Sequence, residues 1–537
     1  MQNNKNLPKV KKFEYPNNVS NNAAKNSLSE EYNKSAHDLS ELFIKEFLDL
    51  CKVPHTSGYL GKFRKYLTSW VIEANKNGLN LESKIDKAGN VIIDVPASEG
   101  KNKKGVAYKD YPNVIYQAHL DMVAAAEKNY RRCGITGKAW IHQKDPVPAV
   151  YDKEKGIIST QGKCTLGADD GFGIATCLAI AKNKDICHGP LRFIFTTDEE
   201  TSLYGAKNLD VKDLDAKYII NLDSTYTGAV LSSSAGGFSC VINKAYELVP
   251  SPDDASMIVL RCGGLLGGHS AIDIERDRGT TFEISRDILK EVYKRDIHCG
   301  FHKLKIGRKV NALSQTMKLC LIFHNEDIKT VKQIVDDVMK ETSKRVSDGE
   351  YLDYSCDDYP AYKSPTISFE NSKKIAQVLF SLPQGIIEQD GETLIQTNNV
   401  GVVDIKEGIF KCELLYRVIE ESIGKAALDH FKQIGKKYNV DVFFKEAFYS
   451  LPKIKNNVLN DLVLESYEKA CGIEGFTFDM HAGNECGCLH NHVPNAYIAS
   501  LGLDVDKEHT PDEVLYTESI PTFMASLLYV MENIYKI

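Results

Sequence analysis

The sequence predicts an α/β protein in which the two ends of the chain form one sheet domain and a second, α+β domain is inserted between them. The chain has 537 residues, and because single cores stop growing at roughly 250–300 residues, two or more domains are expected. Short apolar runs alternate with amphipathic stretches over residues 38–235 and again over 447–537. Over residues 236–446, strands are instead followed by longer, charged helices. This change of pattern marks the insertion.

The composition is typical of a folded globular protein, with 43% hydrophobic and 26% charged residues. A net charge of -7 supplies no basic surface for a phosphate backbone, so no nucleic-acid partner is expected. The 14 cysteines lack the dense spacing of a disulfide scaffold, which predicts a reducing, cytoplasmic location. No run reaches the roughly 20 apolar residues that cross a bilayer, and no apolar signal core follows Met1. No membrane partner is expected.

The first 37 residues are rich in Asn, Lys and Ser and show no helical or strand period, which predicts a disordered tail over residues 1–37. A transit peptide is the alternative, but such segments favour Arg and the first one here is Arg64. Beyond the tail, apolar residues share one helical face: Leu39, Leu42, Phe43, Phe47 and Leu50. The folded part is therefore expected to begin at residue 38.

The elements of the first domain can be placed in order. Apolar runs at residues 114–118, 191–197 and 218–222 are of the kind buried in a parallel sheet, and residues 172–181 predict a helix between the first two. A helix at 458–470 and a strand at 495–501 restore this pattern, so the first domain closes there. In the insertion we predict strands at 317–323 and 409–416, and helices at 330–344 and 424–437.

Side chains that can bind metals follow the predicted strands of the first domain. Ligands bind in open α/β sheets beyond the carboxyl ends of the strands, so we expect these residues to converge. An isolated His-x-Asp is more often a hydrogen-bonded core histidine, and an isolated acidic run is more often a solvated turn, so only their joint occurrence indicates a site. Imidazoles and carboxylates suit a pair of zinc ions with one bridging carboxylate. The candidates are His119, Asp121, Asp169, Asp198, Glu199, Glu200, Asp223 and His509.

Seven segments occur in an order that is specific to one family: residues 117–123 (QAHLDMV), 165–171 (TLGADDG), 198–200 (DEE), 221–223 (NLD), 267–270 (GGHS), 481–487 (HAGNECG) and 509–513 (HTPDE). From about Leu39 onward the chain resembles the cytosolic aminoacyl-histidine (Xaa-His) dipeptidases. These are co-catalytic zinc metallopeptidases related to carboxypeptidase G and peptidase T. The resemblance implies a zinc-peptidase catalytic domain, with a mixed sheet flanked by helices, and an inserted α+β lid domain.

The resemblance also implies a set of metal ligands. One zinc ion (Zn²⁺) would be held by His119 and Asp223 and a second by Glu200 and His509, with Asp169 bridging both. Mn²⁺ or Co²⁺ are conceivable substitutes at such sites. The bridging ligand is the residue on which both ions would depend.

Two further acids take roles beside the metals in this family. Asp121 would accept a hydrogen bond from the ring of His119 and orient it. Glu199 would be the general base that takes a proton from the bridging water, which reacts as hydroxide. Asp170 departs from the pattern of the family, because it stands where relatives often carry Asn.

The resemblance places four more residues around the substrate. His269 would donate a hydrogen bond to the developing oxyanion, although Gly-Gly-His-Ser alone would be read as a surface turn. Arg417 would receive the terminal carboxylate of the substrate, although an arginine at a strand end is otherwise solvated. His481 and Glu485 either line the substrate pocket or serve as helix-capping or core residues.

Together these features predict a two-zinc metallopeptidase that hydrolyses dipeptides, Xaa-His or a broader range, by means of a metal-bridging hydroxide and a glutamate general base. An amidohydrolase acting on N-acyl amino acids is a rival enzyme, because the same chemistry cleaves any amide whose flanking groups fit. A catalytically lapsed peptidase that serves as a binding scaffold is the rival without activity. A homodimer is one assembly state that the sequence leaves open.

Overall fold

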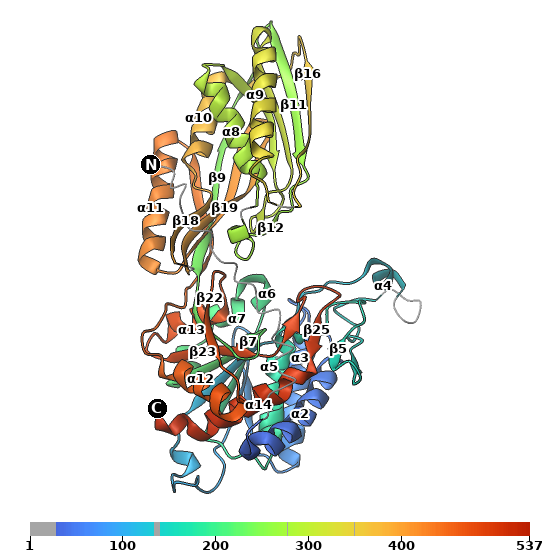
Figure 1. Ribbon diagram of the computed structural model, residues 1–537, viewed down its shortest axis with the longest axis vertical. Helices are drawn as coiled ribbons and strands as arrows, with labels where there is room; N and C mark the ends of the chain where they lie inside the picture. The colour runs from blue at the N-terminus through green and yellow to red at the C-terminus, as the bar shows by residue number, and fades with distance from the viewer. Residues whose placement is uncertain (1–27, 134–139, 277, 348, 392) are drawn as a thin grey trace. The chain divides into compact units, whose positions relative to one another are not determined.

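The computed structural model describes residues 28–133, 140–276, 278–347, 349–391 and 393–537 (Figure 1). The chain divides into two compact units. The first extends to Ser234 and continues in Leu451–Met480 and Asn484–Ile537, while the second contains Ala235–Ser450 and His481–Gly483. The second unit thus extends past the predicted boundary at residue 446, because strand β21 (Asp441–Phe448) pairs with β9 (Gly236–Ala245). It also takes up the three residues that begin at His481.

The first unit contains a mixed sheet of eight strands in the order β1-β2-β6-β3-β7-β23-β8-β22. The strands β6, β3, β7 and β23 are parallel neighbours, which are the four runs that the sequence predicts as a parallel sheet. The predicted α/β class is therefore confirmed. The strand bounds are β1 (Glu82–Ile85), β2 (Val91–Val95), β3 (Val114–His119), β6 (Leu191–Thr196), β7 (Tyr218–Ser224), β8 (Ala229–Ser234), β22 (Phe476–Met480) and β23 (Tyr497–Gly502).

Both faces of the central strands of this sheet are buried, which explains why β3, β6, β7 and β23 are largely apolar. Val114 and Tyr116 belong to a core shared with several helices, whereas Ile115 belongs to a second core shared with α13. Because side chains alternate along a strand, Gln117 and His119 share the α13 face with Ile115. The helices of the first core include α2 (Glu30–Leu50), α5 (Ala168–Lys182), α12 (Val458–Cys471) and α14 (Ile520–Asn533), and α13 spans Glu485–His492.

Helix α2 begins at Glu30, so the prediction that the folded part starts at residue 38 is wrong. Tyr32 and Ala36 are buried, and the Tyr32 hydroxyl donates a hydrogen bond to Glu532. These two residues continue the apolar face of the helix, but the polar residues around them hide the period in the sequence. Residues 1–27 of the predicted tail or transit peptide lie outside the described residues.

A small four-stranded sheet in the first unit was not predicted. Its order is β24-β25-β5-β4, with bounds β24 (Val505–Asp506), β25 (Val514–Tyr516), β5 (Ile157–Ser159) and β4 (Val150–Asp152). It pairs the segment around His509 with the segment that leads to Asp169. The remaining helices of this unit are α3 (Gly61–Lys76), α4 (Lys128–Cys133), α6 (Glu199–Ser202) and α7 (Tyr204–Lys207).

The second unit contains an antiparallel sheet in the order β16-β11-β15-β13-β19-β20-β9-β21, with β18 paired to β19. Four helices contribute to its main core, as expected of an α+β domain. The further strands are β11 (Ala255–Gly263), β13 (Cys299–Ile306), β15 (Met317–His324), β16 (Asp353–Tyr359), β18 (Gly385–Asp390), β19 (Thr393–Lys406) and β20 (Ile409–Val418). The helices are α8 (Thr281–Lys294), α9 (Ile328–Thr342), α10 (Phe369–Ser381) and α11 (Glu421–Tyr438).

Two short pairs complete the second unit. β10 (Leu248–Val249) pairs with β17 (Thr366–Ile367), and β12 (Gly268–His269) pairs with β14 (Ala312–Leu313). Among the helices of the described residues, none combines the length and the hydropathy needed to cross a lipid bilayer.

Candidate metal centre

The carboxylate of Asp169 lies between two imidazoles. Its Oδ1 is 2.9 Å from Nε2 of His119, and its Oδ2 is 3.2 Å from Nε2 of His509. Asp223 lies on the His119 side, with 3.8 Å from its Oδ1 to Nε2 of His119. Glu200 lies on the His509 side, with 2.9 Å from its Oε1 to Nε2 of His509. The structure thus brings all five predicted ligands together as two sets that share Asp169.

The sheet explains why these distant residues meet. His119 is the last residue of β3, and Asp223 lies near the end of the parallel neighbour β7. Glu200 lies in α6, just after β6, and His509 lies in the loop between β24 and β25. Parallel strands place their carboxyl ends at one edge of a sheet, and this edge is where ligands bind in open α/β folds.

A glycine lets helix α5 bring Asp169 to this edge. A Cβ atom at Gly173 would lie 2.8 Å from the Cβ of Ala118 and 2.8 Å from the carbonyl oxygen of Leu222. Any side chain at this position would push α5 away from β3 and β7. The first turn of α5, which carries Asp169, needs this close approach.

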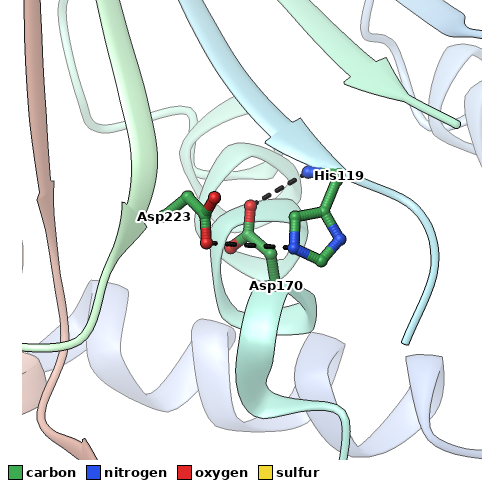
Figure 2. Close-up of side chains that lie close together, drawn as sticks. All are labelled: His119, Asp170 and Asp223. Atoms are coloured by element: carbon green, nitrogen blue, oxygen red, sulfur yellow. Dashed lines mark hydrogen bonds and ion pairs between the residues drawn. The ribbon is translucent and has the colours of Figure 1, made fainter. Parts of the chain in front are cut away.

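Asp170 is a third carboxylate beside His119, and Figure 2 shows it together with His119 and Asp223. Its Oδ2 accepts the main-chain N–H of His119 at 2.9 Å, and its Oδ1 accepts the N–H of Gly173 at 3.1 Å. Both oxygens of Asp170 therefore hold the backbone. Asp223 remains the better candidate for a metal ligand on this side.

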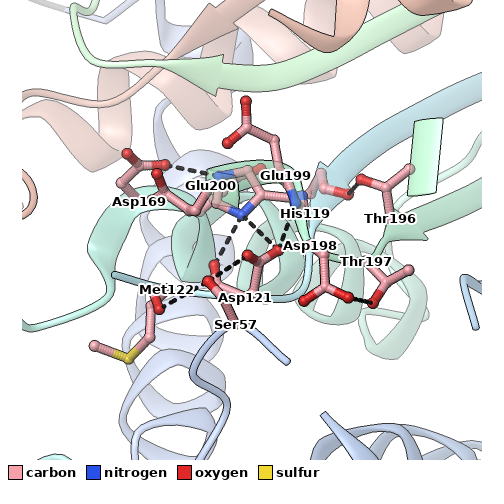
Figure 3. A network of polar contacts seen from close by, with 12 residues as sticks. Ser57, His119, Asp121, Met122, Asp169, Thr196, Thr197, Asp198, Glu199 and Glu200 are labelled. Carbon is pink, nitrogen blue, oxygen red and sulfur yellow. Dashed lines mark hydrogen bonds and ion pairs between the residues drawn. The ribbon is translucent and has the colours of Figure 1, made fainter. Parts of the chain in front are cut away.

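The ring of His119 is oriented by a main-chain atom, and not by the carboxylate that the sequence predicts. Its Nδ1 donates to the carbonyl oxygen of Asp121 at 2.8 Å, whereas Oδ1 of the Asp121 carboxylate is 3.9 Å away (Figure 3). This hydrogen bond fixes the proton on Nδ1 and leaves Nε2 facing Asp169. Asp121 is thus the predicted residue, but its carbonyl oxygen and not its carboxylate accepts the hydrogen bond. A sequence shows which side chains are present, but it does not show which backbone atoms lie near them.

The Asp121 carboxylate instead holds the segment that carries Glu199. Its Oδ1 accepts the main-chain N–H of Glu199 at 2.9 Å, and its Oδ2 accepts the hydroxyl of Ser57 at 2.7 Å (Figure 3). Next to it, Oδ1 of Asp198 accepts the N–H of Gly58 at 2.6 Å. Ser57 and Gly58 were not predicted, since a serine and a glycine in a loop carry no signal of their own.

The buried carboxyl groups of this site favour the binding of cations. Burial raises the pKa of Glu199 far above its usual range, and burial and then Asp169 do the same for Asp223. Burial also opposes ionisation of Asp169, but hydrogen bonds from His119 and His509 outweigh it and lower its pKa. Hydrogen bonds to Asp169 and Glu200 raise the pKa of His509 to about 11. A buried set with more carboxylates than imidazoles suits divalent ions such as zinc.

A buried polar network lies on the α13 face of the sheet and includes residues of the strands that carry His119 and Asp223. Glu485 accepts hydrogen bonds from the hydroxyl of Thr196 at 2.8 Å and from the amide of Gln117. Asn221 donates to the same Gln117 at 2.7 Å. Burial raises the pKa of Glu485 to about 7. Of the two roles left open for Glu485, these contacts favour the core role.

The second unit holds the other candidates in a cluster of its own. Arg417, on β20, is 4% exposed, and its Nη1 donates to the hydroxyl of Ser270 at 2.9 Å and to the carbonyl oxygen of Ser270 at 3.2 Å. Within the described part of the chain no carboxylate forms an ion pair with it, and its Nε has no partner. Burial lowers its pKa to about 10. A buried guanidinium without an anion is costly, which suggests that an anionic ligand completes it.

Two histidines accompany this arginine in the second unit. Nε2 of His481 is 2.8 Å from the hydroxyl of Thr397, and burial and then Arg417 lower the pKa of His481 to about 3. His269 lies on β12, where its Nδ1 accepts the N–H of Ala271 at 3.4 Å. This tautomer carries its proton on Nε2, as a hydrogen-bond donor requires.

The chain is similar in sequence to known peptidases. Residues 115–533 match the model of peptidase family M20/M25/M40. The chain is 26% identical to the cytosol non-specific dipeptidase of Escherichia coli K12 over 91% of this chain and 96% of that protein. A local match of 45% identity links 13% of the chain to 18% of peptidase T from Citrobacter koseri.

One solved structure has a similar fold. The aminoacylhistidine dipeptidase of Vibrio alginolyticus superposes with a TM-score of 0.77 at 23% identity, covering 91% of this chain and 96% of that one. The predicted relationship to aminoacyl-histidine dipeptidases and peptidase T is confirmed at the level of the family. The family match covers most of the chain, including every candidate metal ligand. The chain therefore belongs to peptidase family M20/M25/M40 and is a hydrolase that acts on peptide bonds.

Proposed function

We propose that the protein is a two-zinc dipeptidase whose substrate range is Xaa-His or broader. The observation that carries this proposal is the position of Asp169, with one carboxylate oxygen toward His119 and the other toward His509. Such a residue can bridge two ions at the roughly 3.5–4 Å separation of co-catalytic sites. The names of the relatives, a cytosol non-specific dipeptidase and an aminoacylhistidine dipeptidase, support dipeptides as substrates.

The ligands divide into two sets. His119 and Asp223 would hold one ion, Glu200 and His509 would hold the other, and Asp169 would contact both. Mn²⁺ or Co²⁺ could take the place of zinc with these donors. Divalent ions bound there would lower the pKa of a water toward ~7 and polarise the scissile carbonyl.

Glu199 would carry the proton during hydrolysis. Its backbone is fixed by Asp121, and its side chain lies close to His119 and Glu200. Its carboxylate would take a proton from the attacking water and pass it to the leaving amine. Asp121, Asp198 and Ser57 act by keeping this segment in place.

The second unit would supply substrate contacts. Arg417 would pair with the terminal carboxylate, and His269 would donate its Nε2 proton to the oxyanion. His481 would line the substrate pocket, whereas the contacts of Glu485 favour its core role. The cytoplasmic location and the homodimer stay predictions.

Metal analysis combined with a small substrate panel tests the function. We expect about two divalent ions per chain in active protein, loss of activity on chelation, and recovery when zinc is added. Dipeptides should be hydrolysed faster than N-acetyl amino acids. The opposite order would favour the amidohydrolase, and intact metal without turnover of either class would favour the binding scaffold. Full activity in metal-free protein would contradict the mechanism.

Arg417→Ala should selectively impair substrates that carry a free carboxylate. We expect kcat/KM for dipeptides to fall by roughly 2–5 kcal/mol in transition-state stabilisation, because a buried charge pair is lost. Dipeptide amides should be affected much less, since they lack the group that Arg417 binds. Steady-state kinetics on matched free and amidated dipeptides measure the difference.

Arg261→Ala is the matched control, since Arg261 is about half exposed and paired with Asp357 in the same unit. This variant should retain wild-type kinetics on both substrates. An equal loss for free and amidated dipeptides in Arg417→Ala would show that Arg417 is structural.

A further inference from the structure

Glu513 is a buried carboxylate to which neither the family resemblance nor the mechanism above gives a role. It is 1% exposed and lies in the segment that follows His509. Its Oε2 accepts the main-chain N–H groups of Leu166 at 2.8 Å and Gly167 at 3.0 Å. Its Oε1 accepts those of Ala168 at 2.8 Å and Asp169 at 3.3 Å. All four donors belong to the turn that carries the bridging carboxylate.

The 166–169 turn leads into helix α5, and the N-cap residue Gly167 has no side chain with which to cap it. The first N–H groups of a helix lack intrahelical partners, and an acidic side chain in the first turn commonly caps them. Asp169 is such a side chain at the start of α5. If its carboxylate folded back onto the turn, its oxygens could not face His119 and His509 as they do. Glu513 takes over the capping, and the Asp169 carboxylate stays directed at the imidazoles.

Glu513 also connects two loops that carry ligands. The segments around it are already paired by the ladder between β25 and β5, where Val514 lies opposite Ser159. The carboxylate adds a second connection, next to Asp169 itself. These two connections hold Asp169 and His509 near each other before a metal ion binds.

We propose that Glu513 is the positioning residue of the metal centre. By capping the 166–169 turn it keeps the Asp169 carboxylate available to both ligand sets. This inference rests on the proposed function only in taking Asp169 as a metal ligand. Glu513 reaches Asp169 through the main-chain N–H of Asp169 and not through the Asp169 carboxylate, and so acts through the turn.

Glu513→Gln is the decisive variant, because it preserves the size of the side chain. One of the two acceptor oxygens becomes an NH₂ group that faces two N–H donors. A residue that merely fills space would tolerate this change. Asp512→Asn is the matched control, since it removes the same charge from the adjacent, exposed position.

Two readouts apply to the intact, metal-free protein. We expect amide hydrogen exchange of residues 166–169 to speed up in Glu513→Gln and to stay unchanged in Asp512→Asn. Zinc affinity should fall roughly 10–100-fold in Glu513→Gln, as for other residues that orient metal ligands. Thermal unfolding of both variants shows whether the rest of the fold is intact.

Chemical rescue separates positioning from general stability. Glu513→Ala vacates the space of a carboxylate and its adjoining carbon, which is the shape of acetate. Added acetate should restore both zinc affinity and the slow exchange of residues 166–169, whereas neutral acetamide should restore neither.

Wild-type exchange and wild-type zinc affinity in Glu513→Gln would overturn the inference. So would a loss of protection spread over the whole chain that acetate does not reverse. If the wild-type protein bound no divalent metal, the proposed function would fail. Equal metal binding in wild type and Glu513→Gln would instead overturn only the inference about Glu513.

Discussion

Glu199→Gln is expected to lose roughly 10²–10⁴-fold in kcat while retaining both metal ions. The amide cannot accept a proton, but the side chain keeps its size, and the hydrogen bond from the Glu199 main chain to Asp121 is unaffected. KM for dipeptides should change little, because the lost interaction exists only during the reaction. Turnover measured together with metal content on the same samples tests this expectation.

Glu200→Gln is the companion variant, one residue along the same helix. Glu200 contacts His509 on the side of the second ligand set, so its loss should lower zinc content as well as turnover. Glu199 also lies close to His119 and Glu200 in a group that is able to hold an ion. If both variants lost metal equally, Glu199 would be a ligand, and the general base would have to be sought elsewhere.

Asp169→Asn should have the largest effect on metal binding of any single substitution. Both ligand sets use Asp169, so the variant should lose affinity for both ions, by more than the roughly 10–100-fold caused by loss of a supporting residue. Asn keeps one acceptor oxygen but presents an NH₂ group to one imidazole. Titration of metal-free protein with zinc gives the stoichiometry and the affinity of each site.

Asp223→Asn is the control for a ligand that belongs to one set. It lies on the His119 side only, so one ion should bind as in wild type and the other should weaken. Two unchanged zinc affinities in Asp169→Asn would exclude a shared bridging ligand.

The sequence predicts the parallel strands of the first unit well because they follow from short-range patterns. Apolar runs mark β3, β6, β7 and β23, and the candidate residues His119, Glu200 and Asp223 lie at or just after the ends of three of them. The start of α2 was missed because only two apolar residues, Tyr32 and Ala36, mark its first turns.

Contacts between distant segments escaped prediction for a physical reason. Glu513 and Leu166 are separated by 347 positions, and their hydrogen bond involves a backbone N–H that every residue other than proline has. The same holds for the main-chain carbonyl of Asp121, which orients His119 in place of the carboxylate. Residue types reveal chemistry, but only folded geometry shows which backbone atoms that chemistry uses.

The spacing of the ligands along the chain has a consequence for the timing of synthesis. Chains are made from the N-terminus, and domains fold as their sequence emerges. His119 and Asp169 are synthesised early. The second ligand set, which includes His509, and its connection through Glu513 are complete only after residues 509–513 have been synthesised. A nascent or interrupted chain that stops earlier holds an incomplete centre. The proposed metal centre can therefore be completed only when the polypeptide is nearly finished.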